Sequence, residues 1–374
     1  MSQKSRFKPN WIEQAASPDS YRSLFKWGDP LGFKHPNSGM YRLIKESFGM
    51  SDDDFVQPQR TGMESFDFVA PIGLATAQLE SLGQIVGREN VFTGAYERTS
   101  ASYGRGMVDA LRLRQHIVEN LPGAVVAPRS TQDVQAVMQY CNEQHIPLYV
   151  HGGGSTVTRG MEAIQGGICL DMSRHMNQLV SFSEINQTVT VQAGMLGPAL
   201  EEILNQAPEK LKAKHRYTCG HFPQSFMHSS VGGWVVTRGA GQNSTYYGKI
   251  EDLVLAQEYV TPRGVLQTPG YPRSATGPDF DQIMIGNEGT FGILYSATLR
   301  MCRYQPKNTR YYGYLFKTWE DGVNACRDVM QGDGQDQQDA ALPAGLHPFR
   351  PFPCRKSRMD MGQDLVNTPQ EDPT

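Results

Sequence analysis

Leu148-Tyr149-Val150-His151-Gly152-Gly153-Gly154-Ser155-Thr156 is the stretch that decides the fold. Its apolar start predicts a β-strand, and three consecutive glycines follow that strand. Residues without a Cβ let neighbouring backbone N–H groups point at one place, which suits an anion such as a cofactor pyrophosphate. An ordinary surface turn explains the glycines equally well, so this stretch alone leaves both interpretations open.

The spacing around these glycines excludes two well-known phosphate-binding loops. A Rossmann dinucleotide fingerprint needs G-x-G-x-x-G at the start of a helix, and a Walker loop needs a lysine after its last glycine. Neither pattern is present, and residues 157–160 do not begin an amphipathic helix. A phosphate at this position would therefore bind to a loop, with partners from further along the chain.

Composition narrows the class of protein. The chain has 374 residues, 39% of them hydrophobic, and a net charge of −3, which argues against non-specific nucleic-acid binding. Six cysteines without a C-x-x-C pair predict reduced thiols in a cytoplasmic protein rather than a disulfide framework or a zinc site. We expect neither a signal peptide nor a transmembrane segment, because the N-terminus lacks an apolar core and no apolar run reaches about 18 residues.

Strands and helices are predicted on both sides of the glycine stretch. Residues 124–127 predict a strand, and Ser130 is a candidate N-cap for a helix whose apolar face is formed by Val134, Val137, Met138 and Cys141. The glycines therefore follow the second strand of a β-α-β unit. Further strands are expected at 168–170, 188–191, 253–260 and 293–301, and a helix at Gly197-Pro198.

The two ends of the chain have a different character. Residues 1–106 are polar and irregular, and we interpret them as an N-terminal arm with one or two helices, one of them at 76–85 with Thr76 as its N-cap. Residues 331–374 are rich in glycine, proline and polar side chains without apolar periodicity. We expect this tail to be disordered. A frameshifted reading frame or a natural lineage-specific tail would explain its composition.

Three more glycine-containing motifs follow along the chain. Residues 229–234 place small residues beside a tryptophan, where a flat ring could lie against bare backbone, although a tight helix start is the simpler explanation. Residues 276–279 fit an ordinary type I turn, and residues 286–292 form another glycine-rich loop before a strand. Each motif alone is more often structural than functional, and their order along the chain carries the signal.

In this order the motifs resemble the PCMH-type FAD-binding domain of the vanillyl-alcohol-oxidase class. Within that class the chain is similar to alkyl-dihydroxyacetonephosphate synthases and bacterial FAD-linked oxidases. The matching strings are residues 152–156, 231–238, 247–254, 260–264, 276–279 and 286–292, with a weaker match at 103–106.

The resemblance implies an α+β fold with a PCMH-type FAD-binding domain at 107–303, built from two α/β subdomains near 107–185 and 186–303. It also implies an incomplete cap domain that starts at 304–330, where residues 312–316 and 319–323 look like its first strand and helix. The rest of the cap and the C-terminal part that carries the family's catalytic tyrosines and histidines have no counterpart here, so the catalytic residues are unknown.

The same resemblance implies FAD as the cofactor and assigns the residues that contact it. One loop departs from the family pattern Thr-Gly-His-x-Pro-x-Ser, because Cys219 replaces the threonine and Phe222 and Gln224 replace acidic residues. The expected contacts are Val150, His151, Gly152, Gly153, Gly154, Ser155, Thr156, His221, Pro223, Gln224, Ser225, Ser229, Gly232, Gly233, Thr237, Arg238, Gly239, Ala240, Glu288, Gly289, Thr290, Gly292 and Ile293.

Two histidines, His151 and His221, lie in or next to these motifs. His151 precedes the glycines, whereas histidines that tether FAD covalently in this class follow the glycine pair, so we expect a non-covalent flavin. His221 is either close to the flavin edge or simply packed within its loop. No Ser-His-Asp arrangement and no metal-ligand spacing is evident in the sequence, and we expect no metal site.

The expected function is that of an FAD-binding oxidoreductase-type flavoprotein resembling alkylglycerone-phosphate synthase of ether-lipid synthesis, which exchanges an acyl group for an alkoxyl group. The alternatives are an FAD-dependent 2-hydroxy-acid dehydrogenase of the glycolate or D-lactate type and a catalytically inactive FAD-binding fragment. The expected partner is a small-molecule or lipid-derived substrate, not nucleic acid, and the protein could form a homodimer. Without the cap, we expect this chain to show no turnover.

Overall fold

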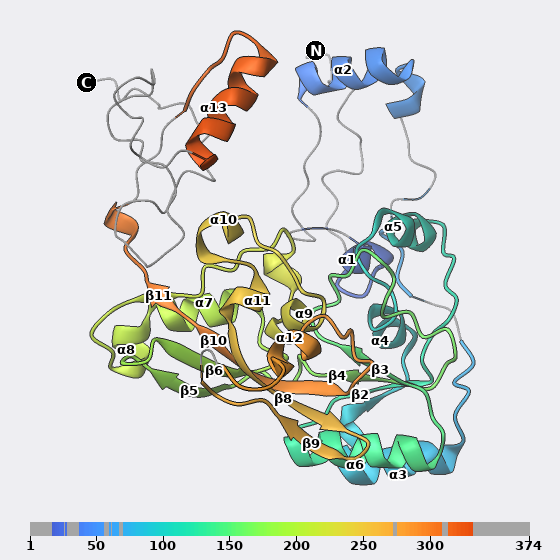
Figure 1. Ribbon diagram of the computed structural model, residues 1–374. Helices are drawn as coiled ribbons and strands as arrows, with labels where there is room; N and C mark the ends of the chain where they lie inside the picture. The colour runs from blue at the N-terminus through green and yellow to red at the C-terminus, as the bar shows by residue number, and fades with distance from the viewer. Residues whose placement is uncertain are drawn as a thin grey trace.

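The computed structural model describes residues 17–25, 27, 37–55, 60, 62–66, 70–271, 275–308 and 313–331 (Figure 1). The tail expected beyond residue 331 lies outside these residues, as does Tyr312 of the expected cap strand. Two sheets organise the well-described central part of the chain, one mostly parallel and one antiparallel.

The first sheet has the strand order β1-β2-β4-β3. Its strands are β1 (Val91–Phe92), β2 (Ala124–Val126), β4 (Ile168–Asp171) and β3 (Leu148–His151). Strand β4 pairs in parallel with both β2 and β3, so it separates the two strands of the expected β-α-β unit. Strands β2 and β4 are fully buried, which explains why they read as short continuous apolar runs.

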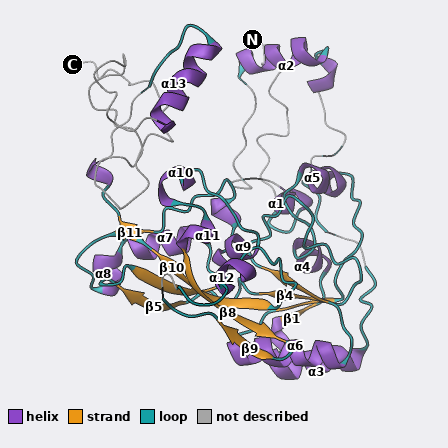
Figure 2. Cartoon of the chain, in the orientation of Figure 1, coloured by secondary structure: helices purple, strands orange, loops and turns teal. Residues whose placement is uncertain are grey.

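Helices cover both faces of this first sheet. Helices α3 (Thr76–Val86) and α6 (Thr131–Glu143) lie on one face (Figure 2). Their apolar side chains pack there with Ala124, Val126 and Leu170. Helix α4 (Ala95–Ser100) lies near the other face, where Ala101 packs against Val125 and Cys169. Because side chains along a strand point alternately to its two faces, neighbouring residues pack against different layers.

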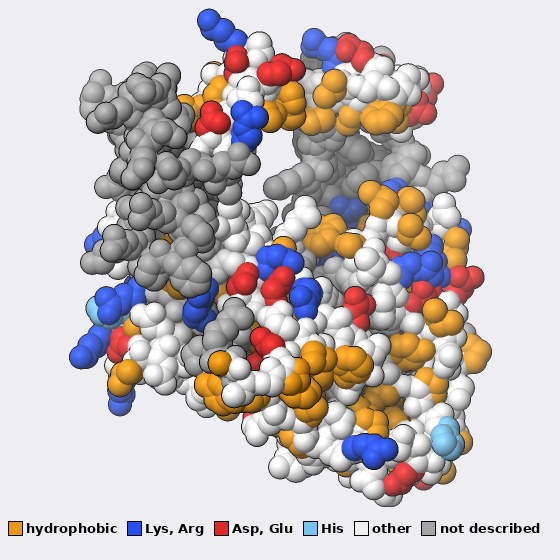
Figure 3. Space-filling model, in the orientation of Figure 1, with side chains coloured by type: hydrophobic (Ala, Val, Ile, Leu, Met, Phe, Trp, Pro, Cys, Tyr) orange, Lys and Arg blue, Asp and Glu red, His pale blue; other side chains and the backbone are white. Residues whose placement is uncertain are grey.

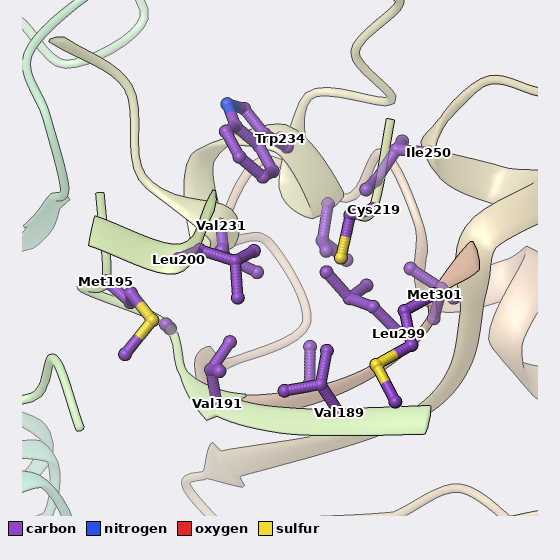
Figure 4. Packing of buried hydrophobic residues seen from close by; sticks show 14 of the residues in the cluster. Val189, Val191, Met195, Leu200, Cys219, Val231, Trp234, Ile250, Leu299 and Met301 are labelled. Atoms are coloured by element: carbon purple, nitrogen blue, oxygen red, sulfur yellow. The ribbon is translucent and has the colours of Figure 1, made fainter. Parts of the chain in front are cut away.

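The second sheet is antiparallel and has the order β5-β6-β10-β8-β9. Its strands are β5 (Leu179–Ser183), β6 (Thr188–Gln192), β10 (Ile293–Arg300), β8 (Val254–Thr261) and β9 (Gly264–Gln267). Its buried face packs on helices α7 (Gly197–Asn205) and α9 (Val231–Val236). Figure 4 shows Val189 and Val191 of β6 pointing toward Leu200 and Val231 of these helices.

The two sheets are joined through one apolar cluster. Val260 of β8 and Ile293 of β10 pack with Leu82 of α3 and Val134 of α6, which belong to the layer of the first sheet. Buried area of this kind contributes about 25 cal/mol per Å² to stability. The shared cluster therefore fixes the position of one sheet relative to the other.

The expected core elements form close to their predicted bounds, but two helix predictions were wrong. Helix α3 has Ala75 as its N-cap rather than Thr76, because the Gln78 side chain accepts the Ala75 N–H at 2.9 Å and closes the first turn. The region before residue 107 contains not one or two helices but α1 (Tyr21–Phe25), α2 (Ser38–Phe48), α3 and α4 within its described part.

Helix α4 shows why the sequence did not reveal it. Arg98 is 2% exposed, and its guanidinium donates to the carbonyls of Ala70, Pro71 and Pro122. A buried arginine satisfied by backbone carbonyls replaces the apolar stripe that would reveal a helix by periodicity. Strand β1 lies just before α4 and pairs with β2, so the first sheet draws one strand from the N-terminal region.

The remaining elements are short or peripheral. Gly313–Phe316 is not a strand, although α13 begins at Trp319 where a helix was expected. Met107, the first residue of α5 (Met107–Arg114), is 75% exposed. Figure 3 shows hydrophobic side chains on the surface in the region of this helix. The other elements are α5 (Met107–Arg114), α8 (Ala207–Leu211), β7 (Tyr217–Thr218), α10 (Ser244–Tyr247), α11 (Ile250–Leu253), α12 (Phe280–Met284), β11 (Cys302–Arg303) and α13 (Trp319–Gln331).

Candidate cofactor site

The glycine loop after β3 packs directly against another backbone segment. A Cβ on Gly152 would collide with the Ser230 hydroxyl, and one on Gly153 would collide with the carbonyl of His228. Gly154 has a φ of +64°, a conformation that residues with a Cβ rarely adopt. The three glycines are thus required by the path of the chain itself, whatever else they bind.

The backbone donors of this loop have no acceptor in the protein. Among the hydrogen bonds of the described residues, none is donated by the backbone N–H groups of Gly152–Thr156. All five residues are partly exposed. A run of unpaired donors at the end of a strand is the arrangement that a phosphate group satisfies.

A second segment, residues 103–106, supports the loop from behind. The Arg105 N–H donates to the Thr156 carbonyl at 2.8 Å, and a Cβ on Gly104 would collide with that same carbonyl. A Cβ on Gly106 would lie 3.0 Å from the Val157 carbonyl. These contacts explain the weak motif match at 103–106, since its two glycines allow the chain to lie against the glycine loop.

Buried charges fix the chain just beyond the loop. The Glu162 carboxylate accepts from Arg112 at 3.2 Å and from Asn120 at 2.9 Å, and it also bonds Arg159. Burial opposes ionisation of Glu162, but these partners outweigh it and lower its pKa. The network ties α5 to residues 159–162, so both ends of the glycine loop are anchored.

The Cys219–Ser225 loop reaches the same region from β7. His221 is 1% exposed, and its ring lies 4.8 Å from the Trp234 ring of α9. Within the described part of the chain, neither ring nitrogen of His221 has a hydrogen-bond partner. Burial lowers the pKa of His221 to about 4, with the charge of Glu251 acting in the opposite direction, so the ring is neutral at pH 7.

Several of the remaining expected contacts lie on helix α9 or next to it. Ser230 caps the helix by accepting the Gly233 N–H at 3.2 Å, and the Trp234 Nε1–H donates to the Ser229 hydroxyl at 2.7 Å. A Cβ on Gly232 would lie 2.7 Å from the Ala193 Cβ of the chain that follows β6. Part of this motif therefore serves helix packing.

The C-terminal end of α9 carries Thr237 and Arg238. The Thr237 hydroxyl donates to the Gly233 carbonyl at 2.7 Å. The Arg238 guanidinium donates to the carbonyls of Gln282 at 2.8 Å and Ile285 at 3.2 Å. These bonds hold the chain before the Gly286–Gly292 loop, which is a structural role for a side chain that the sequence places at the cofactor.

The Gly286–Gly292 loop packs against the same end of α9. Its Gly286 and Glu288 N–H groups donate to the carbonyls of Val235 and Val236 at 3.1 and 2.9 Å. The Thr290 hydroxyl donates to the Asn287 carbonyl at 2.7 Å. Ile293, the last expected contact, is 2% exposed within the core.

Helix α9 is the element that brings the predicted site residues together. Its N-terminal end meets the glycine loop, its Trp234 ring meets His221, and its C-terminal end meets residues 286–288. Sequence reasoning missed Ser230, whose hydroxyl lies against Gly152. A serine two residues before a glycine pair is a candidate N-cap, and that signal could have revealed it.

His151 points toward an acidic partner. Its Nδ1 lies 3.4 Å from the Asp171 carboxylate, and Arg174 Nε lies 3.1 Å from the same group. Burial raises the pKa of Asp171, but its bonds to His151 and Ser173 outweigh burial and lower it well below its usual range. Within the described residues no cluster of metal-ligating side chains is found.

Comparisons with known proteins agree with this geometry. Residues 122–269 match the model of the FAD binding domain family. The alkyldihydroxyacetonephosphate synthase of Dictyostelium discoideum is 31% identical over 63% of this chain and 38% of its own length. The uncharacterized FAD-linked oxidoreductase YgcU of Escherichia coli K12 is 34% identical over 68% of this chain and 51% of its own.

A solved structure of alkyldihydroxyacetonephosphate synthase has the same fold, with a TM-score of 0.63 and 27% identity over 70% of this chain and 46% of that one. Residues 122–269 are therefore an FAD-binding domain, and FAD is the cofactor that it indicates. The chain therefore contains a domain of the FAD binding domain family and is similar to alkyldihydroxyacetonephosphate synthases and to an FAD-linked oxidoreductase. It spans about two fifths to half the length of these relatives.

Within the described residues, no helix combines the length and the apolar character needed to cross a membrane. The residues present fit the diphosphate of FAD, because the unpaired donors of Gly152–Thr156 lie on a fixed, glycine-lined loop. The first four residues of the expected site, Val150–Gly153, lie together at the end of β3 and the start of this loop.

Proposed function

We propose that Gly152–Thr156 bind the diphosphate of a non-covalently held FAD. The observation that carries this proposal is the set of unpaired N–H donors on a loop held in place by residues 103–106 and 228–230. A pre-formed cradle is favourable because the donors need no reorganisation when the anion arrives. The segments around α9 would then border the rest of the cofactor.

A non-covalent flavin is supported by the position of His151. Its ring is directed toward Asp171, with Nδ1 engaged at 3.4 Å, and it stands before rather than after the glycines. The protein should therefore release its yellow colour into the supernatant on acid precipitation. Flavin fluorescence that stays with the denatured polypeptide on a gel would contradict this.

The activity that we propose for the whole protein is of the alkyldihydroxyacetonephosphate synthase type. Bound FAD would supply the electron-accepting ring, while the residues of this chain bind and orient it. The support is similarity to such synthases both in sequence, at 31% identity, and in fold, at a TM-score of 0.63. A small-molecule substrate carrying an exchangeable acyl group is the class that this proposal implies.

The direct test is a titration of purified protein with FAD, followed by flavin fluorescence and visible absorbance. We expect saturable one-to-one binding and a visible spectrum that differs from that of free FAD. If the protein binds no flavin after refolding in excess FAD, the proposed FAD site is refuted. Incorporation of a long-chain alcohol into acylated dihydroxyacetone phosphate would test the activity separately.

We propose that the protein is cytoplasmic. The five described cysteines are all free, which supports a reducing compartment such as the cytoplasm. A homodimer is proposed as the assembly. Size-exclusion chromatography with light scattering distinguishes it from a monomer of 41.6 kDa.

A further inference from the structure

A buried carboxylate lies behind the Cys219–Ser225 loop. Glu201 of α7 is 7% exposed, and its carboxylate accepts the Thr218 hydroxyl at 2.7 Å and the Cys219 N–H at 2.8 Å. The Asn205 amide donates to it at 3.0 Å. No cation pairs with Glu201 among the residues that the structure describes, so hydrogen-bond donors alone satisfy this carboxylate.

The partners of Glu201 lie on the backbone that enters the loop. The Thr218 hydroxyl, which donates to Glu201, also accepts the Gly220 N–H at 3.0 Å. Gly220 has a φ of +71°, and a Cβ there would collide with the Tyr247 ring. The chain at residues 218–220 is therefore clamped between a carboxylate on one side and an aromatic ring on the other.

The clamp determines where the next residues lie. His221 follows Gly220 directly and packs on Trp234, and the Phe222 carbonyl accepts the Gln242 N–H at 2.8 Å. Residues 223–225 come next. A displacement at residues 218–220 would be passed to these residues, because His221 directly follows the clamped segment.

We propose that Glu201 is a positioning residue, which acts through the backbone of residues 218–220 to hold His221–Ser225 in the conformation that contacts the flavin. This inference rests on the proposed FAD site. Carboxylate chemistry is required, because both oxygens accept hydrogen bonds from Thr218, Cys219 and Asn205. Replacing the carboxylate with an amide puts an N–H group where an acceptor is needed.

The test compares Glu201→Gln with Glu202→Gln, its neighbour on the same helix, which is exposed and bonds Lys210 at the surface. We expect Glu201→Gln to weaken FAD binding about tenfold and to shift the visible flavin spectrum. Glu202→Gln should match the wild type, and Glu201→Asp should recover part of the affinity. A Glu201→Gln protein with wild-type affinity and spectrum would overturn the inference while leaving the FAD site standing.

A second measurement uses the protein without FAD and does not depend on the cofactor. Hydrogen exchange followed by mass spectrometry should show faster exchange in the peptide that contains residues 218–225 of Glu201→Gln, and no change in Glu202→Gln. If Glu201→Gln fails to fold, Thr218→Val removes one donor to the carboxylate and should give the same effects at a smaller size. Unchanged exchange in the 218–225 peptide of the folded variant contradicts the clamp. If the wild-type protein does not bind FAD, the proposed function and this inference are both refuted.

Discussion

Two glycine-rich loops of this protein look alike in sequence and differ in what their backbone does. In the loop at 152–156, none of the five N–H groups has an acceptor among the described hydrogen bonds. In the loop at 286–292, Gly286, Glu288, Gly289 and Thr290 all donate to protein acceptors. Glycine therefore allows close chain packing in both loops, whereas unsatisfied donors distinguish the first loop, which is the one that we propose binds an anion.

The largest expected effect comes from Gly153→Val. Its side chain would strike the His228 carbonyl and displace the loop whose donors are proposed to bind the diphosphate. We expect FAD affinity to fall more than 100-fold, as measured by fluorescence titration, because several charge-assisted bonds are lost together.

The matched control for that change is Gly289→Ala in the second loop. Gly289 has a φ of +87°, but a Cβ added there would meet no atom within 4 Å, so the cost is backbone strain of about 1 kcal/mol in unfolding free energy. FAD affinity should stay within a few-fold of the wild type. An equal loss of affinity in both variants would show that the two loops share the diphosphate.

The second prediction concerns His221 and acid. Burial lowers its pKa to about 4, below the 6.5 of the unfolded chain, so the unfolded state binds the proton first as pH falls. The stabilisation is complete above pH 6.5 and is lost as pH falls toward 4, on the order of 3 kcal/mol at most.

Urea unfolding of the FAD-free protein at pH 7 and pH 4.5 measures this loss. His221→Leu removes the titrating group, and its unfolding free energy should change less over the same interval. Equal pH dependence in both proteins would show that His221 is already accessible to protons in the folded state.

The sequence predicted the elements that a local apolar pattern encodes, and it missed elements that depend on contacts with distant residues. The strands at 124–126, 148–151 and 254–261 and the helix at 131–143 were predicted well, because local apolar periodicity encodes them. Helix α4 was missed, because its buried Arg98 is satisfied by carbonyls from distant residues. Long-range backbone contacts leave no local pattern.

The candidate site also combines features with a local sequence pattern and features that depend on long-range contacts. The glycine loop was predicted as a possible anion site from its own residues, with a surface turn as the alternative. Its contacts with residues 103–106 and 228–230 follow from tertiary packing that no spacing rule describes. The role of Glu201 was not anticipated, because a glutamate on an amphipathic helix is usually exposed. Only the fold shows that it faces the start of a loop.

The third prediction tests whether Arg238 contacts the cofactor. Its guanidinium bonds the carbonyls of Gln282 and Ile285, which hold the chain before the second glycine loop. We expect Arg238→Met to lower the unfolding free energy by about 1 kcal/mol and to leave FAD affinity within threefold. A much larger loss of FAD affinity would place the guanidinium at the diphosphate, and the second loop would then join the first as part of the anion site.

The smallest effect is expected from Thr290→Val in the second loop. The Thr290 hydroxyl donates to the Asn287 carbonyl at 2.7 Å, and valine keeps its shape without the donor. One partly exposed hydrogen bond contributes about 0.5–1.5 kcal/mol, so thermal unfolding should shift by a few degrees at most. FAD affinity should not change, because this hydroxyl already has a protein acceptor. A clear loss of affinity with unchanged stability would mean that the hydroxyl leaves Asn287 for the flavin, and the contrast between the two loops would then be one of degree.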